Sequence, residues 1–199
     1  MRIGVIDTGC ANLASVRFAL ERAGLDHVAA AKPSGLGDCD RLILPGVGSA
    51  APAMARLAGR GWSELLRGDD RPLLGICLGM QLLFDRSDEG GVDGLGLIGG
   101  DIVRLPQSAD LVWPHMGWNE LEALDADEPL LAGIAPGSHA YFVHGYYAAP
   151  GPATRATCDY GTPVSALVRQ GHVAGCQFHP ERSGVAGARI LANFAGARS

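Results

Sequence analysis

The first 85 residues alternate short apolar runs with segments of helical periodicity, and this alternation restricts the fold more than any other feature. The apolar runs predict strands over residues 3–6, 28–31, 41–44 and 72–76. Helical spacing of apolar residues predicts helices over 13–23, 50–66 (interrupted near Gly59 and Gly61) and 78–84. Because strands that alternate with helices form a parallel sheet covered on both faces, we expect a doubly wound α/β fold.

From about Gly90 the pattern changes to short extended runs that are separated by turn residues, as at Gln170-Gly171. These runs predict strands over 101–105, 115–120, 141–146, 153–158, 164–169 and 172–177. A closing helix is expected from about 184 to 197. Since no linker divides the chain, residues 1–199 are predicted to form one domain, with an antiparallel extension on the parallel core.

Composition and charge exclude several classes of protein. The net charge of -5 argues against a dedicated nucleic-acid binder, which would carry a basic stripe. No apolar run reaches the roughly 18 residues of a membrane helix, and the start of the chain does not resemble a signal peptide. The cysteines, which form neither a C-x-x-C pair nor a zinc spacing, are Cys10, Cys39, Cys77, Cys158 and Cys176. We expect reduced thiols, no metal site and a cytoplasmic location.

The segment Gly75-Ile-Cys-Leu-Gly79 lies where a predicted strand passes directly into a predicted helix. A nucleophile on such a sharp turn needs small residues two positions before and after it, because larger side chains would clash. The turn also places Cys77 at a helix N-terminus, where the positive end of the dipole favours the thiolate. There the N–H of Leu78 can form half of an oxyanion hole. The alternative is that Cys77 is a small buried apolar residue.

A cysteine nucleophile needs a base, and the base needs an orienting group. The segment His179-Pro-Glu181 supplies both, because proline keeps the preceding residue extended and extended residues i and i+2 project to the same side. Glu181 can therefore fix the His179 tautomer and stabilise the imidazolium. The other five histidines have no acidic residue obviously placed to orient them. The alternative is a loop in which both side chains are merely solvated.

The loop Pro45-Gly-Val-Gly48 follows a predicted strand and could bring a second backbone N–H, from the Val47–Gly48 region, to the substrate oxygen. Glycine permits the close approach and the peptide flip that this role would need. A plain structural turn is the competing interpretation.

Together these residues resemble the class I glutamine amidotransferase family. The segments that carry the resemblance are Gly75–Phe84, Pro45–Gly48 and Gln177-Phe-His-Pro-Glu181. The resemblance, which covers nearly the whole chain, implies a flavodoxin-like fold and a Cys77-His179-Glu181 triad. It implies hydrolysis of glutamine to glutamate and ammonia through a Cys77 thioester, without a metal or organic cofactor.

The chain is similar to one branch of the family at Met80, Pro114–Asn119 and Tyr141–Tyr146. The glutaminase of that branch delivers ammonia to a separate (β/α)8-barrel cyclase subunit of histidine biosynthesis. By this resemblance, the oxyanion hole comprises Val47, Gly48 and Leu78. The substrate-binding residues would be Gly46, Gln81, His144 and Tyr146. The residues toward the partner interface and the ammonia exit would be Asn12, Trp118, Tyr141 and Arg182.

Two positions depart from the family pattern: Thr8 stands where the family usually has Tyr, and Gly145 where it usually has Thr or Ser. If position 145 binds glutamine through its backbone, glycine is tolerable there, whereas a needed hydroxyl would predict weaker substrate binding. Three alternatives to the cyclase-linked glutaminase stay open. They are a glutaminase subunit of another synthase, a catalytically silent binding subunit, and a cysteine esterase or peptidase.

Overall fold

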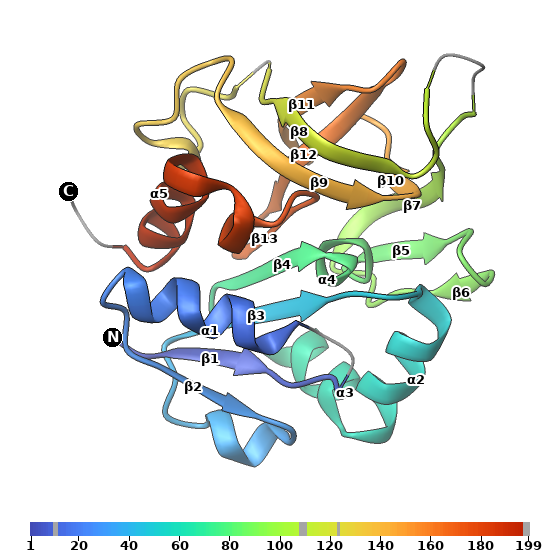
Figure 1. Cartoon of the computed structure of the whole chain (residues 1–199). Coiled ribbons are helices and arrows are strands. Elements are labelled where there is room, and N and C mark those ends of the chain that lie inside the picture. Colours follow the sequence, from blue (N-terminus) through green and yellow to red (C-terminus); the bar gives the residue numbers. More distant parts are fainter. Residues whose placement is uncertain (10–11, 108–110, 123, 197–199) are drawn as a thin grey trace.

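A mostly parallel sheet of seven strands runs through the computed structural model, which describes residues 1–9, 12–107, 111–122 and 124–196 (Figure 1). Its order is β11-β12-β13-β4-β3-β1-β2. The strands are β1 (Ile3–Ile6), β2 (His27–Ala30), β3 (Arg41–Gly46), β4 (Leu73–Cys77), β11 (Thr154–Asp159), β12 (Pro163–Gln170) and β13 (Val173–Cys176). From β13 to β2 the neighbours are parallel, while β12 and β11 extend the sheet antiparallel. The predicted parallel core with an antiparallel extension is confirmed.

Helices cover both faces of this sheet, because its strands are apolar on both sides. The α-helices are α1 (Leu13–Arg22), α2 (Ala50–Gly59), α3 (Trp62–Gly68), α4 (Leu78–Gln81) and α5 (Gly184–Phe194). On one face α1 and α5 bury Leu20 and Ile190 in a common core. On the other, α2 and α3 bury Leu57 and Trp62 in a second core (Figure 1). This is the expected doubly wound, flavodoxin-like arrangement, and that it forms one domain stays a prediction.

Two smaller sheets lie beside the central one. One has the order β10-β7-β5-β6 and the other is the antiparallel pair β8-β9. Their strands are β5 (Phe84–Ser87), β6 (Val92–Asp93), β7 (Ile98–Arg104), β8 (His115–Glu120), β9 (His139–His144) and β10 (Tyr146–Ala148). Short 3-10 helices complete the chain: η1 (Pro33–Leu36), η2 (Pro129–Leu131) and η3 (Pro180–Arg182). No helix in the described residues has the length and apolar character needed to cross a membrane.

Several local predictions are confirmed. The helix expected over 50–66 breaks at Gly61, whose φ of 80° suits glycine, and α3 then continues to Gly68. The hairpin at Gln170-Gly171 joins β12 to β13, with Gly171 at φ 59°. The last helix ends at Phe194, short of the predicted end at 197, which lies outside the described residues together with Cys10.

The helix predicted over 78–84 is wrong in its second half, because α4 ends at Gln81 and Phe84 begins β5. The carbonyls of Leu82 and Leu83 accept hydrogen bonds from residues 95–98, which also pair with Phe84. Tertiary hydrogen bonding therefore overrides the helical pattern of these apolar residues. The run predicted over 141–146 is also divided, since β9 ends at His144 and β10 begins at Tyr146.

Candidate active site

Three adjacent parallel strands bring the predicted site together at one edge of the sheet. Gly46 of β3 is in register with Cys77 at the end of β4. On the other side of β4, Cys176 of β13 is in register with Ile76, so the segment leading to His179 leaves the sheet beside the cysteine. The carboxyl ends of parallel strands are where open α/β sheets bind their ligands. The structure thus places Cys77 and the segment that leads to His179 at neighbouring strand ends.

Cys77 lies on a strained turn between β4 and α4, with φ 54° and ψ −113°. It is the single non-glycine residue with positive φ among the described residues. A Cβ added to Gly75 would lie 2.7 Å from the Gly79 carbonyl oxygen, and one added to Gly79 would lie 1.8 Å from that of Leu44. The two flanking glycines are therefore required by space, as the sequence predicts.

His179 and Glu181 form a buried pair, with 2.7 Å between His179 Nδ1 and Glu181 Oε1. The side chains are only 5% and 2% exposed. Burial, the largest single effect, disfavours the imidazolium, but the neighbouring Cys77 and Glu181 outweigh it and raise the pKa of His179 to about 10. The expected pairing of base and orienter is thus present in the structure. A glutamate also lies 3.8 Å from His27 and from His139, so the expectation that His179 alone has an acidic partner is wrong.

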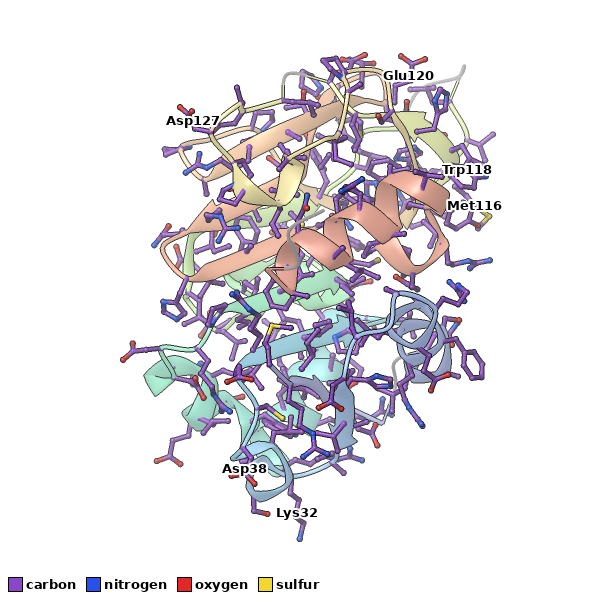
Figure 2. All side chains as sticks on the ribbon, turned by 90° about the vertical axis from the view of Figure 1, so that its left-hand side faces the viewer. Lys32, Asp38, Met116, Trp118, Glu120 and Asp127 are labelled. Carbon is purple, nitrogen blue, oxygen red and sulfur yellow. The ribbon has the colours of Figure 1, made fainter. Side chains whose placement is uncertain are left out.

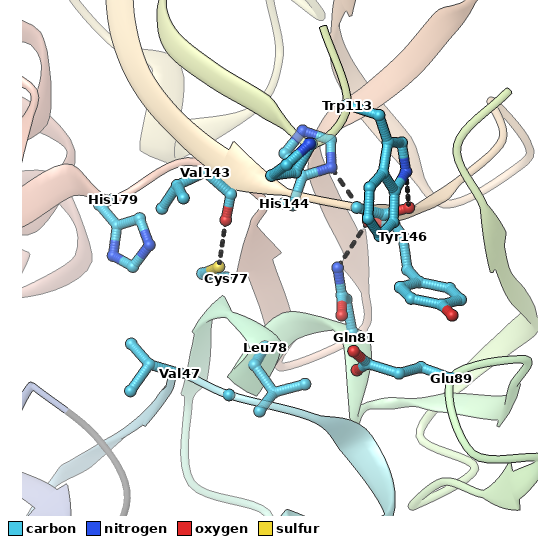
Figure 3. A pocket seen from close by; sticks show the side chains of 13 residues that line it. Val47, Cys77, Leu78, Gln81, Glu89, Trp113, Val143, His144, Tyr146 and His179 are labelled. Atoms are coloured by element: carbon cyan, nitrogen blue, oxygen red, sulfur yellow. Dashed lines mark hydrogen bonds between the residues drawn. The ribbon is translucent and has the colours of Figure 1, made fainter. Parts of the chain in front are cut away.

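The thiol and the imidazole face a common pocket of about 320 Å³ (Figure 3). Cys77 Sγ lies 3.7 Å from the Val143 carbonyl oxygen, and His179 Nε2 has no hydrogen-bond partner among the described residues. The unpaired nitrogen is available for a proton carried by the thiol or by a bound molecule. The residues lining the pocket are Val47, Gly48, Cys77, Leu78, Gln81, Glu89, Trp113, Pro114, Val143, His144, Gly145, Tyr146 and His179.

The predicted oxyanion residues Val47, Gly48 and Leu78 therefore all line the same pocket as the thiol. Gly48 has φ 95°, and a Cβ placed on it would meet nothing within 4 Å. Gly46 does not line this pocket. It lies against α4 instead, where a Cβ would be 2.5 Å from the Gly79 nitrogen. Its role in the structure is to allow this close approach of β3 to α4.

Gln81 and Tyr146, which the sequence predicts as substrate-binding residues, are joined to each other. Gln81 Nε2 donates to the Tyr146 carbonyl oxygen at 2.7 Å and to Gln177 Oε1 at 3.0 Å. The amide nitrogen is thus used within the protein, which leaves the amide oxygen of Gln81 as the group that can serve a ligand.

Both ring nitrogens of His144 are also engaged inside the protein. Nδ1 lies 3.0 Å from the Tyr146 carbonyl oxygen and Nε2 lies 2.9 Å from His115 Nδ1. Since a carbonyl only accepts, His144 carries its proton on Nδ1, and His115 Nδ1 must then donate to His144 Nε2. Chiefly because of burial, the pKa of His115 is lowered to about 4 and that of His144 to about 3. His144 therefore shapes the pocket as a neutral ring.

The predicted interface residues Trp118, Tyr141 and Arg182 lie together. Trp118 and Tyr141 are cross-strand neighbours with ring centroids 6.0 Å apart, and the Arg182 guanidinium carbon lies 4.6 Å from the centre of the Tyr141 ring. Trp118 and Met116 project outward from the same edge of the molecule (Figure 2) and are 56% and 62% exposed. Asn12 is the N-cap of α1 and lines a small recess that His179 and Glu181 also line.

Two pocket residues, Glu89 and Trp113, lie outside every segment that the sequence analysis identifies. Glu89 follows β5, and its carboxylate accepts a hydrogen bond from the Ala50 N–H at 2.8 Å. Its pKa is raised because the group is partly buried. Trp113 precedes β8 and is 37% exposed. Turn residues mark both segments as loops, but no spacing in the sequence indicates that they return to Cys77.

The family model for class-I glutamine amidotransferases matches residues 10–197, and the chain belongs to this family. Within it, the chain is 50% identical over 192 residues to "Imidazole glycerol phosphate synthase subunit HisH" of Pasteurella multocida, covering 96% of each protein. The protein of the same name from Xylella fastidiosa (strain Temecula1) is 51% identical over 192 residues, again covering 96% of each.

Solved structures show the same fold at low sequence identity. A structure described as a glutamine amidotransferase superposes with a TM-score of 0.75 at 22% identity, over 98% of this chain and 97% of that one. PurLQS from Thermotoga maritima gives 0.74 at 20% identity, over 98% and 97%. These likenesses confirm the fold predicted from the sequence.

Proposed function

We propose that this protein is the glutaminase subunit of an imidazole glycerol phosphate synthase. It hydrolyses glutamine to glutamate and ammonia, and the ammonia passes to a cyclase subunit for histidine biosynthesis. The observation that carries the proposal is the placement of Cys77 and the His179–Glu181 pair on neighbouring strand ends around one pocket. The identity of about 50% to the HisH subunits supports the particular pathway.

In the proposed reaction His179 accepts the Cys77 proton, and the thiolate attacks the side-chain amide carbon of glutamine. The oxyanion is held by the N–H groups of Leu78 and of the Val47–Gly48 region. His179 then protonates the departing nitrogen, the C–N bond breaks and ammonia leaves. A water molecule, activated by His179, adds to the thioester, and cleavage of the S–C bond releases glutamate.

The raised pKa of His179 suits the second of these proton transfers. An imidazolium that is stabilised by Glu181 remains protonated at neutral pH until the leaving nitrogen needs the proton. In the structure, Glu181 Oε1 accepts the Nδ1 proton at 2.7 Å, so Nε2 is the nitrogen that faces the reaction.

The amino-acid end of glutamine would lie toward Gln81, Glu89 and Tyr146, away from His179 (Figure 3). Glu89 is a carboxylate on the pocket wall and suits a substrate ammonium group. We assign Gln81 to the substrate through its amide oxygen, since its nitrogen is already bonded. Tyr146 and His144 would contribute the wall and the backbone of this end of the pocket.

The partner would be a (β/α)8-barrel cyclase subunit that docks over Trp118, Tyr141 and Arg182, with Asn12 near the ammonia exit. Exposed aromatic and arginine side chains are typical of protein interfaces, and Trp118 is more than half exposed in this chain. A cytoplasmic location fits the four described cysteines, all of which are buried and unpaired.

Replacing Cys77 by Ala tests the function. We expect glutamate release by the complex with the cyclase subunit to fall to background, because no nucleophile remains. Cyclisation that is driven by added ammonium salts should persist, because that reaction bypasses this chain. The measurement is glutamate and cyclase product formation in parallel, with glutamine or with ammonia.

The matched control is Cys39→Ala, which removes another buried thiol that does not line the pocket. It should retain glutamine-dependent activity. Full glutamate release by the Cys77→Ala variant would exclude the mechanism. A wild-type chain that no cyclase subunit stimulates would exclude the pathway.

A further inference from the structure

Gly145 lies between β9 and β10, at the position where the family usually has Thr or Ser. Its φ is not among the positive values that favour glycine, so backbone conformation does not require glycine here. Space does. A Cβ at Gly145 would lie 2.6 Å from Trp113 Cζ2 and 3.0 Å from Cε2. The Trp113 indole thus occupies the volume that a side chain at 145 would take.

The indole is held in this place from two sides. Its Nε1 donates a hydrogen bond to the Gly145 carbonyl oxygen at 3.3 Å. The Arg104 guanidinium carbon lies 4.7 Å from the ring centre, which is cation–π geometry. The same Gly145 oxygen accepts from the Leu105 N–H at 2.9 Å. Trp113 and Leu105, the residue that follows β7, therefore hold the Gly145 carbonyl group together.

The peptide that Trp113 fixes belongs to the pocket wall. His144, Gly145 and Tyr146 all line the pocket, and the Tyr146 oxygen binds the Gln81 amide. Trp113 lines the pocket as well. It stands on the side of Gln81 and Tyr146, away from His179 (Figure 3). We therefore expect Trp113 to contact a bound molecule at the end that lies away from the Cys77 thiol.

We propose that Trp113 is a specificity-determining residue of the glutamine pocket, paired with Gly145. The indole supplies the wall that a side chain at 145 would otherwise supply, and it holds the 144–146 segment against the amino-acid end of the substrate. The proposal rests on the proposed function, since it names the ligand as glutamine. A group that contacts this end in both ground and transition states acts on binding, so KM changes more than kcat.

A double-mutant cycle tests the pairing. Trp113→Val leaves a hole in the wall, and Gly145→Ser forces the indole out of place. Each change alone is expected to raise KM for glutamine about tenfold or more in the complex with the cyclase subunit. In the double variant the new side chain enters the vacated space, so KM returns toward the wild-type value. Additive losses, or single variants with unchanged KM, would overturn the proposal.

Val112→Ala is the matched control, because Val112 precedes Trp113, is 76% exposed and does not line the pocket. Its KM should equal that of the wild type. If Trp113→Val does not fold, Trp113→Leu replaces it in the cycle, since leucine also lacks the six-membered ring whose Cζ2 a side chain at 145 would meet. Thermal melting of every variant identifies loss of folding.

Measuring glutamine binding in the Cys77→Ala variant distinguishes a failure of this proposal from a failure of the proposed function. Calorimetry of that complex is expected to give a Kd that rises with Trp113→Val and recovers with the added Gly145→Ser. A Kd that Trp113→Val leaves unchanged contradicts the role of Trp113 while the function stands. If the Cys77→Ala variant binds no glutamine and the wild type releases no glutamate, the proposed function is what fails.

Discussion

Cys77 has a backbone conformation that side chains rarely adopt, and the surrounding contacts maintain it. Gly46, Gly75 and Gly79 let β3, β4 and α4 approach so closely that no side chain fits at any of the three positions. A positive φ costs a non-glycine residue of the order of 1–3 kcal/mol and persists only where the surroundings enforce it. The strained turn points the thiol into the pocket, which suits the attack that is proposed for it.

Glu181→Gln tests the charge of the triad at the residue scale. The amide oxygen can still accept from His179 Nδ1, but the negative charge that helps to raise the pKa of His179 is lost. We expect kcat for glutamine to fall by up to about 10⁴, as when a triad carboxylate becomes an amide. Glutaminase kinetics of the complex measure this, with ammonia-driven cyclisation as the control that should not change. A kcat within a few-fold of the wild type would contradict the role of the charge.

At this scale the sequence predicts the triad because each member carries a local signal. Glycines flank Cys77, and a proline separates His179 from Glu181. Glu89 and Trp113 have no such signal, because their function depends on loops that fold back from other sheets. The engagement of His144 with His115 is likewise a product of the β8-β9 register, in which the two residues are opposite each other.

At the scale of elements, η3 carries Glu181 and is held by α5. A Cβ on Gly187 of α5 would lie 1.9 Å from the Pro180 carbonyl oxygen, so the helix contacts the backbone of η3 directly. Ser183 adds a second connection, because its Oγ donates to the His179 carbonyl oxygen and accepts from the Tyr141 N–H. The position of Glu181 thus depends on a helix that does not line the pocket.

Gly187→Ala is expected to separate α5 from η3. Overpacking of this kind typically costs about 1–3 kcal/mol, and the displacement of Glu181 should lower kcat as well. Urea unfolding and glutaminase assays measure the two effects. The control is Gly59→Ala in α2, where a Cβ meets nothing within 4 Å, so stability should hold or rise. Equal behaviour of the two variants would show that the η3 contact has no such role.

The limits of sequence prediction also differ between elements. The β-α alternation up to β4 is readable because each segment has a regular apolar period. The end of α4 cannot be predicted in this way, since Leu82 to Phe84 continue the helical pattern while their carbonyls accept hydrogen bonds from residues 95–98. These hydrogen bonds depend on a segment that is more than ten residues away in the sequence, so the local apolar periodicity cannot predict them.

At the scale of the whole molecule, a hydrogen-bonded network of neutral groups runs from the pocket through the β8-β9 sheet to β11 at the edge of the central sheet. His144 accepts from His115, whose Nε2 lies 3.4 Å from Asn119 Nδ2, and that amide donates to the Asp159 carbonyl oxygen. His115 is stacked between Phe142 and Tyr160, with ring centroids at 4.9 and 3.9 Å. Protonation of either imidazole would break this network, because His144 Nε2 is the acceptor for His115 Nδ1 and His115 Nε2 is the acceptor for Asn119 Nδ2.

The two neutral histidines of this network predict that the protein loses stability in mild acid. The folded pKa values of about 4 and about 3 lie below the ordinary 6.5, so the unfolded chain binds more protons between these values. Stability should therefore fall as the pH drops from 6.5 toward 4, and melting temperatures across that range measure it. The raised pKa of His179 affects stability in a different pH range. The stability that it contributes is lost as the pH rises from 6.5 toward 10.

His115→Phe keeps the stacking but removes one titrating group and the donor to His144. It should be less stable than the wild type at pH 7.5 and should lose less stability on acidification. His139→Asn, which replaces an exposed histidine, should follow the wild-type curve. Parallel curves for the wild type and His115→Phe would exclude the buried pair as the cause.

The sequence by itself determined the order of strands and helices up to β4, the strained cysteine turn and its His–Glu partner, because these depend on periodicity and on residues a few positions apart. Only the tertiary structure decided what surrounds them. Trp113 against Gly145, Glu89 in the pocket and the neutral His115–His144 pair all join segments far apart in the chain. Such contacts depend on how sheets and loops pack in three dimensions, and Gly145, a departure from the family pattern in the sequence, becomes in the structure the space that Trp113 fills.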